Sequence, residues 1–254
     1  MTSEASNGGG TIAAVPQQAM VLAAGLGTRM RPLTDTTPKP LIEVAGRSLL
    51  DRTLDTLASA GVARAVVNGH HLADQIEAHL AAHDRGPTLA FSDERAMLLD
   101  SGGGVSHALP LLNDGPLLVA NSDTFWVEDE PRALAAMAAT RCDDDDVVLL
   151  LARREEAVGF AGAGDFMRGP DGTLTRRGDA PNAPYVYAGA LLAHTHHFAD
   201  PPDAVWSLNR LFDAAIAEGR LRGAVLDGLW LHVGTPEAIG EAEAALAAFV
   251  RDSR

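Results

Sequence analysis

Short apolar runs alternate with amphipathic segments along this chain, and the alternation restricts its fold more than any other feature does. Continuous apolar runs predict buried strands over residues 20–24, 64–68, 88–92, 116–120 and 147–152. Helical spacing of apolar residues predicts helices over residues 49–60, 72–83, 101–111 and 131–140. This repeated strand–helix–strand order implies an α/β fold whose mixed, mostly parallel sheet is flanked by helices on both faces.

The second half of the chain has a different sequence pattern. From about residue 159, glycines and turns become frequent, with short β-like segments at 185–187 and 190–192. Helices are expected over 206–218 and 236–250. We interpret residues 18–254 as one domain in which the second half extends the same sheet. The polar, glycine-rich tail at 1–17 is expected to be disordered.

Composition excludes several classes of function. A net charge of −14 over 254 residues argues against broad binding to nucleic acids or anionic membranes, so an anionic ligand must be met by a local basic site. The first residues lack the pattern of a secretory signal, and no segment is apolar enough to cross a membrane. The single cysteine, Cys142, permits no internal disulfide. We therefore expect a cytoplasmic protein.

The loop after the first predicted strand concentrates glycines and cations. Residues 25–29 read GLGTR, and Arg31 and Lys39 follow closely. Glycines directly after a strand let backbone N–H groups approach a phosphate, and the prolines on both sides of Lys39 stiffen its backbone. The segment matches neither a dinucleotide-binding fingerprint nor a P-loop. Its clustered cations predict a polyphosphate site.

A second polar segment, Asn121-Ser122-Asp123, follows the apolar run 117–120. This segment and the glycine loop both come directly after strands, so both are expected at the carboxyl edge of the sheet, where ligands bind in such folds. A rigidly held carboxylate suits Mg²⁺, which makes Asp123 the best candidate ligand. The alternative is an Asx turn at the strand end. Asn121 shares the face of Asp123 if the strand geometry continues.

The stretch LAAGLGTRMRPLT, followed by PKPL, resembles the signature of the sugar-1-phosphate nucleotidyltransferases. The resemblance continues through Asn68, 101–104, 121–123, 187–189 and 230–237, and covers about residues 18–250. These enzymes join a nucleoside triphosphate to a sugar 1-phosphate and release pyrophosphate. The resemblance implies a Rossmann-like, glycosyltransferase-A-like fold, small-molecule substrates and Mg²⁺.

The resemblance also implies roles for residues of this chain. The nucleotide would bind Ala23, Ala24, Gly25, Gly27, Thr28, Arg29, Lys39, Glu94, Gly102 and Gly103. Arg29, Lys39 and Asp123 would serve catalysis, and Asn121, Asp165 and Gly189 would contact the sugar. Residues 18–158 would then hold the nucleotide, 159–235 would form a sugar-binding lobe, and 236–250 a C-terminal helix.

Within that family, the short length and the LDSGGG stretch are most similar to the bacterial N-acetylmuramate 1-phosphate uridylyltransferases of cell-wall recycling. Mannose-1-phosphate guanylyltransferases and glucose-1-phosphate uridylyl- or thymidylyltransferases are the alternatives. A weakened regulator that binds nucleotide or sugar phosphate without catalysis is an alternative of another class. The base, the sugar and the oligomeric state stay open.

His232 departs from the family pattern, which has an aspartate at this position as a second Mg²⁺ ligand. Neutral imidazole is a poorer ligand for Mg²⁺ than carboxylate is, and it suits Mn²⁺ better. His232 either ligates a softer metal, holds a metal-bound water, or leaves the ion to Asp123 and the phosphates. We expect retained activity with an altered metal preference.

The other polar clusters carry less information. His70-His71 and the group His194, His196 and His197 lack the spacing of a zinc site. The run from Asp143 to Asp146 is expected to be a solvated loop, with weak Ca²⁺ binding as the alternative.

Overall fold

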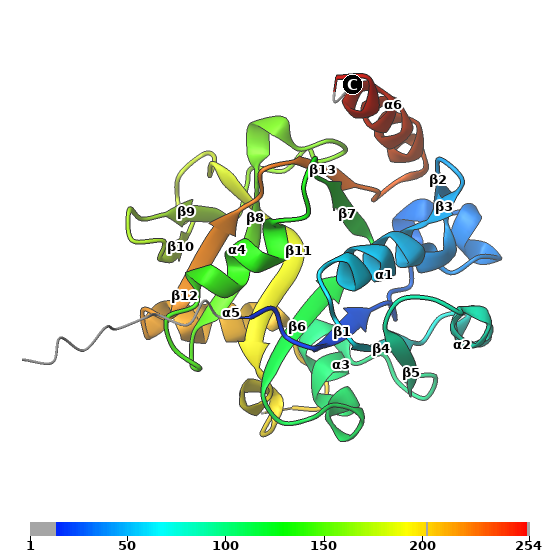
Figure 1. Ribbon diagram of the computed structural model, residues 1–254, viewed down its shortest axis with the longest axis horizontal. Helices are drawn as coiled ribbons and strands as arrows, with labels where there is room; N and C mark the ends of the chain where they lie inside the picture. The colour runs from blue at the N-terminus through cyan, green and yellow to red at the C-terminus, as the bar shows by residue number, and fades with distance from the viewer. Residues whose placement is uncertain (1–13, 202, 253–254) are drawn as a thin grey trace, which may run out of the picture.

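Figure 1 shows the computed structural model of the chain, which describes residues 14–201 and 203–252. The strands of its central sheet are β1 (Gln18–Leu22), β4 (Arg64–Gly69), β5 (Thr88–Asp93), β6 (Pro116–Asn121), β8 (Val147–Arg153), β9 (Phe166–Arg168), β10 (Leu174–Arg176), β11 (Tyr185–His194) and β12 (Leu221–Val225). They form a nine-stranded sheet with the order β10-β9-β11-β6-β1-β4-β5, in which β8 joins β11 and β12 joins β8. The first thirteen residues of the predicted tail lie outside the described residues.

Four adjacent strands of the sheet, β6, β1, β4 and β5, run parallel. β1 pairs in parallel with β4 and β6, which places Met20 opposite Val66 and Val119. β5 continues this parallel set beyond β4, and β12 pairs in parallel with β8. β11 runs antiparallel to both β6 and β8. The predicted fold class, a mixed and mostly parallel α/β sheet, is confirmed.

Helices cover both faces of the sheet. One face packs against α1 (Leu49–Ser59), α2 (Ala73–Ala82) and α4 (Ala133–Thr140), and the other against α3 (Asp100–Ala108) and α5 (Leu208–Ala217). Side chains alternate along β1, so Val21 joins the first buried cluster and Met20 the second. Parallel strands covered on both faces must be apolar throughout, which explains their continuous apolar runs.

A smaller unit lies beside one end of the sheet. It comprises the antiparallel pair β7 (Thr124–Val127) and β13 (Leu229–His232), the hairpin β2 (Glu43–Val44) and β3 (Arg47–Ser48), and the terminal helix α6 (Pro236–Asp252). Helix α6 packs against β13 and β2 at the periphery (Figure 1). Met30, Phe125 and Leu231 belong to the buried cluster that holds this unit together.

Strands β1 and β11 differ from the prediction. β1 ends at Leu22, because Ala23 donates its N–H to the Asn68 side chain instead of continuing the ladder. The predicted segments 185–187 and 190–192 are one strand, β11, whose register shifts between Tyr187 and Leu191. Gly189 lies in that irregularity with a φ of 89°. Such a φ favours glycine and explains why the segment resembles two separate strands.

Candidate active site

The carboxyl ends of three parallel strands meet where the glycine loop begins. Leu22, the last residue of β1, pairs with Asn121, the last residue of β6. The Ala23 N–H donates to Asn68 Oδ1 at 2.6 Å, so the end of β4 fixes the first residue of the loop. Strand topology therefore brings together two segments that are about 100 residues apart in the sequence.

The glycine loop is anchored at one glycine and open at the other. Gly27 has a φ of 61°, and a Cβ there would lie 2.8 Å from Thr34 Cγ2. The Gly27 carbonyl also accepts a hydrogen bond from the Thr34 hydroxyl at 2.9 Å. Gly25 and Leu26 are exposed and make no hydrogen bond to another residue in the part of the chain that the structure describes. Their N–H groups are therefore available to an anion.

The cations of this loop differ in how they are paired. Arg31 forms an exposed ion pair with Asp35 at 3.2 Å. Arg29 is exposed and pairs with no carboxylate among residues 14–201 and 203–252. Its charge acts on Asp123 and His232 across the site. Arg29 is thus the cation of the loop that a ligand can use.

Lys39 is held differently, because its ammonium points inward. Only 8% of Lys39 is exposed, and its Nζ lies 3.0 Å from Asp123 Oδ2. Burial alone would raise the pKa of the Asp123 carboxyl, but the charge and the hydrogen bond of Lys39 keep that pKa below its ordinary value. Asp123 is therefore ionised at neutral pH, and the rest of its carboxylate can face a ligand.

His232 reaches the same point from the end of β13. The pairing of β13 with β7 sets His232 opposite Thr124, next to Asp123. The His232 Nδ1 lies 3.2 Å from the Gly159 carbonyl oxygen, which can only accept, so the proton sits on Nδ1 and Nε2 keeps a lone pair in the neutral ring. Burial lowers the pKa of His232, while Asp123 opposes that shift. The ring also stacks on Trp230, with centroids 6.0 Å apart.

A buried polar pair supports the glycine loop from below. Asn68 Nδ2 donates to Glu94 Oε1 at 2.6 Å, and both residues are only 2% exposed. Burial raises the pKa of Glu94, although the hydrogen bond from Asn68 opposes the shift. A Cβ on Gly104 would lie 2.7 Å from Asn68 Nδ2, so Gly104 makes room for the pair. Glu94 therefore supports the loop through Asn68, and a direct contact of Glu94 with the base stays a prediction.

Gly102 and Gly103 serve packing in this structure. Both N–H groups donate to the Trp206 carbonyl oxygen, at 2.9 and 3.0 Å. A Cβ on Gly102 would lie 2.5 Å from the Trp206 ring, and one on Gly103 would lie 2.4 Å from the Ala204 carbonyl oxygen. These N–H groups already have an acceptor in this structure, and contact of Gly102 and Gly103 with a base stays a prediction.

A polar cavity of about 300 Å³ opens next to the strand ends. Its lining comprises Ser101, Asn121, Asp165, Phe166, Arg176, Tyr187, Ser207, Leu208, Asn209 and Phe212. Asp165 is anchored there, because its Oδ2 accepts the Tyr187 N–H at 2.9 Å. The Tyr187 hydroxyl is buried and has no hydrogen-bond partner within the described residues. Burial, and then the charge of Asp123, raise the pKa of Tyr187.

Arg176 is the cation of this cavity. Its Nε lies 2.8 Å from Asp213 Oδ1, and its Nη2 donates to Asn209 Oδ1 at 3.0 Å. The guanidinium also stacks over the Phe166 ring at 4.9 Å. These contacts hold the planar group in one orientation at the cavity wall. Sequence reasoning missed Arg176, which comes from a strand of only three residues.

Gly189 lies close behind the cavity. A Cβ at Gly189 would lie 2.2 Å from Thr124 Oγ1 and 3.3 Å from Asn121 Cβ. The glycine therefore lets β11 approach the end of β6, which positions Asn121 at the cavity wall. Its conformation and this close approach account for a glycine here.

Comparisons with known proteins agree with a functional site at this edge of the sheet. The model of the nucleotidyl transferase family fits residues 18–163, which include the glycine loop, Lys39 and Asp123. The chain belongs to the nucleotidyl transferase family. It is 46% identical to the N-acetylmuramate alpha-1-phosphate uridylyltransferase of Caulobacter vibrioides over 91% of this chain and 98% of that protein. It is 35% identical to the protein of the same name from Neisseria meningitidis, over 91% and 99% of the two chains.

Solved structures agree on the fold. UDP-glucose pyrophosphorylase complexed with UDP-glucose superimposes with a TM-score of 0.74 at 15% identity, over 91% of this chain and 98% of that one. The family transfers nucleotidyl groups to sugar 1-phosphates and generally depends on a divalent metal, so the chain is a sugar-1-phosphate nucleotidyltransferase. No helix among the described residues is long and apolar enough to span a membrane.

The acidic run 143–146 is a loop in which Asp143, Asp144 and Asp145 are exposed as expected, and only Asp146 departs from the prediction. Asp146 is 3% exposed, not solvated, and its Oδ2 accepts from the Cys142 N–H at 2.8 Å and from Arg222 Nε at 3.1 Å. Asp144 pairs with Arg141 at 3.1 Å. Arg222, which is distant in the sequence, therefore anchors the end of the run through Asp146, whereas Asp144 pairs locally with Arg141.

Proposed function

We propose that this enzyme transfers the uridylyl group of UTP to N-acetylmuramate 1-phosphate, forming UDP-N-acetylmuramate and pyrophosphate. Two relatives with this named activity match the chain over nearly its full length. The structural observation that carries the proposal is Arg176 at the wall of the polar cavity. N-acetylmuramate carries a carboxylate that N-acetylglucosamine lacks, and a fixed guanidinium is the group that recognises a carboxylate.

The glycine loop and its cations would hold the triphosphate. The free N–H groups of Gly25 and Leu26 would bind phosphate oxygens, and Arg29 would neutralise the charge of the departing pyrophosphate. Lys39 would bridge the phosphates and Asp123. An oxygen of the sugar phosphate then attacks the α-phosphorus in line, and the bond to pyrophosphate breaks. No protein nucleophile is needed, because the reaction depends on positioning and on charge neutralisation.

Asp123 and His232 fit a divalent ion between the two substrates. The first offers an ionised carboxylate and the second a neutral ring with a free Nε2. When bound, such an ion would neutralise phosphate oxygens of both substrates. A carboxylate with one imidazole accepts Mg²⁺ and favours Mn²⁺ relative to a pair of carboxylates. We propose Mg²⁺ as the ordinary ion, with Mn²⁺ as an effective substitute.

The cavity would hold the sugar between the two parts of the chain. Ser101 and Asn121 come from the proposed nucleotide part, 18–158, while Asp165, Arg176 and Tyr187 come from the proposed sugar lobe, 159–235. Asp165 would accept from a sugar hydroxyl, and the Tyr187 hydroxyl would donate to a sugar or acetamido oxygen. Because both parts line one cavity, they act as one site.

The test is a matrix of four nucleoside triphosphates against N-acetylmuramate, N-acetylglucosamine, mannose and glucose 1-phosphates, with pyrophosphate release as the readout. We expect the highest kcat/KM for UTP with N-acetylmuramate 1-phosphate. Arg176→Gln should lower that value about tenfold or more and leave N-acetylglucosamine 1-phosphate unaffected. Arg177→Gln is the matched control, since Arg177 donates to the Ala180 carbonyl and does not line the cavity. A preference that survives Arg176→Gln would contradict this assignment.

The product indicates a place in metabolism. Muramate is a sugar of the bacterial cell wall, and a nucleotide-activated form returns it to wall synthesis. We propose that the enzyme acts in peptidoglycan recycling in the cytoplasm, where UTP is available.

A further inference from the structure

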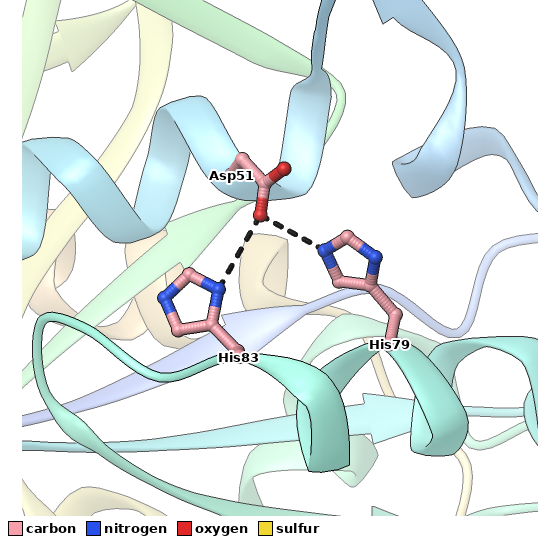
Figure 2. Close-up of side chains that lie close together, drawn as sticks. All are labelled: Asp51, His79 and His83. Atoms are coloured by element: carbon pink, nitrogen blue, oxygen red, sulfur yellow. Dashed lines mark hydrogen bonds and ion pairs between the residues drawn. The ribbon is translucent and has the colours of Figure 1, made fainter.

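Three potential metal ligands meet between two helices, outside the site described above (Figure 2). Asp51 projects from the first turn of α1, and His79 lies on α2, one helical turn before His83 at the end of that helix. His79 Nε2 lies 2.9 Å and His83 Nδ1 3.6 Å from Asp51 Oδ1. Among the residues that the structure describes, this is the one group of three such side chains whose donor atoms all lie within 4.8 Å of one another.

The helices that carry these side chains are fixed by the core. Leu54 of α1 and Ile76 and Leu80 of α2 belong to the same buried cluster beside the sheet. The carboxylate and the two rings are partly shielded, with side-chain exposures of 17% for Asp51, 30% for His79 and 8% for His83. A ligand set on two helices that pack on the same face of the sheet is preorganised, and the more exposed His79 leaves an approach from solvent.

The three donor atoms suit a transition-metal ion. Two imidazoles and a carboxylate, with a fourth position open to water, are a donor set that Zn²⁺ accepts in tetrahedral geometry. Ligand separations of 2.9 and 3.6 Å bracket those around a tetrahedral ion with bonds of about 2 Å. Mg²⁺ prefers oxygen ligands, so the set discriminates against it.

We propose that Asp51, His79 and His83 form a site for Zn²⁺ or a similar first-row transition ion that links α1 to α2. The site is independent of the proposed reaction, since none of its residues belongs to the glycine loop, the polar cavity or the pair Asp123 and His232. Binding of an ion there stabilises the folded state, because the three ligands meet only when the helices are packed.

The test is a calorimetric titration of tag-free, full-length protein with Zn²⁺ in excess Mg²⁺, in a His232→Ala background that removes the imidazole of the active site. We expect one equivalent to bind, and melting temperature to rise with Zn²⁺ concentration. Asp51→Asn and His79→Gln should weaken binding by about 100-fold or more and abolish the rise in melting temperature. His196→Gln is the matched control, because His196 also pairs with a single carboxylate, 3.2 Å away at Asp145.

Two results would overturn the site: no saturable Zn²⁺ binding, or equal binding in Asp51→Asn, His79→Gln and the control. Pyrophosphate release with Mg²⁺, measured for His79→Gln in the otherwise native chain, should be unchanged, which separates loss of the metal from loss of the fold. Failure of this proposal would leave the proposed nucleotidyl transfer intact, and the reverse also holds.

Discussion

Lys39 Nζ lies 3.0 Å from Asp123 Oδ2, so one ion pair joins the phosphate-binding loop to the strand end that carries the proposed metal ligand. The two residues are 84 positions apart, and the parallel pairing of β1 with β6 brings their segments together. The pair fixes the direction of the ammonium and keeps the carboxylate ionised. Both groups are therefore charged and in position before substrates arrive, which lowers the reorganisation that the reaction requires.

Replacement of Lys39 by methionine should lower kcat by about 100-fold to 1,000-fold, because it removes a preorganised cation from the phosphates. Steady-state pyrophosphate release measures the effect. Arg31→Met is the control, since Arg31 is an exposed cation of the same loop that is paired with Asp35. Its activity should stay within about threefold of the native value. Equal losses in both variants would show that the overall charge of the loop, and not the position of Lys39, matters.

The two glycines of the loop should respond differently to alanine. Gly27→Ala should destabilise the protein by about 1–2 kcal/mol, because its φ is 61° and its Cβ would collide with Thr34. Gly25→Ala should change the free energy of unfolding by less than about 0.5 kcal/mol, since nothing lies within 4 Å of a Cβ there. It should nonetheless raise KM for UTP about tenfold by crowding a phosphate. Denaturant unfolding and steady-state kinetics on both variants check this contrast.

The Glu94→Gln variant tests the buried pair under the loop. Burial raises the folded-state pKa of Glu94 above its unfolded value, so the folded protein binds the proton more tightly and loses stability as pH rises through that window. Glutamine keeps an acceptor for Asn68 and carries no charge. The stability of Glu94→Gln relative to the native chain should therefore rise with pH from about 4.5 and then level off.

The Glu237→Gln variant should show the opposite change in stability when denaturant unfolding of both variants is measured over the same pH range. Hydrogen bonds at the start of α6 lower the pKa of Glu237, so its charge stabilises the folded state once it ionises. The relative stability of Glu237→Gln should fall as pH rises through that range. Parallel curves for the two variants would contradict the assigned environments.

Much of the fold and part of the site could be predicted from the sequence. Strands buried on both faces are apolar throughout, and polar segments directly after them mark the binding edge, so the glycine loop and Asp123 could be placed together. The packing of Trp206 against Gly102 could not be predicted, because the two residues are about 100 positions apart and periodicity does not show contacts between distant elements. Arg176 gave no signal, since β10 has only three residues.

The proposed zinc site likewise could not be predicted in full from the sequence. The sequence shows that His79 and His83 are four residues apart, at the end of a predicted helix, but this spacing alone does not indicate a metal site. Their partner Asp51 depends on how α1 packs against α2, which periodicity alone does not determine. Residue spacing within one element can be read from the sequence, whereas contacts between distant elements require the structure.

Tyr187→Phe should separate binding from stability. The Tyr187 hydroxyl is buried at the cavity and has no hydrogen-bond partner within the described residues. Its removal should leave the melting temperature unchanged or raise it, because an unsatisfied buried group is lost. KM for the sugar 1-phosphate should rise about threefold to tenfold, the value of one hydrogen bond. A fall in melting temperature with unchanged KM would assign the hydroxyl to the fold.

The His232→Asp variant tests the metal preference. A second carboxylate favours Mg²⁺, so the ratio of kcat/KM with Mn²⁺ to that with Mg²⁺ should fall about tenfold relative to the native chain. Pyrophosphate release over a titration of each ion gives both values. Identical metal profiles in the two proteins would mean that His232 does not coordinate the ion.

The most direct test of the account is the reaction of UTP with N-acetylmuramate 1-phosphate and Mg²⁺, followed by mass spectrometry of the products. We predict UDP-N-acetylmuramate and pyrophosphate in equal amounts, with loss of both in Lys39→Met. Binding of both ligands by the native protein without pyrophosphate release would contradict the account and identify a regulator that no longer catalyses the transfer.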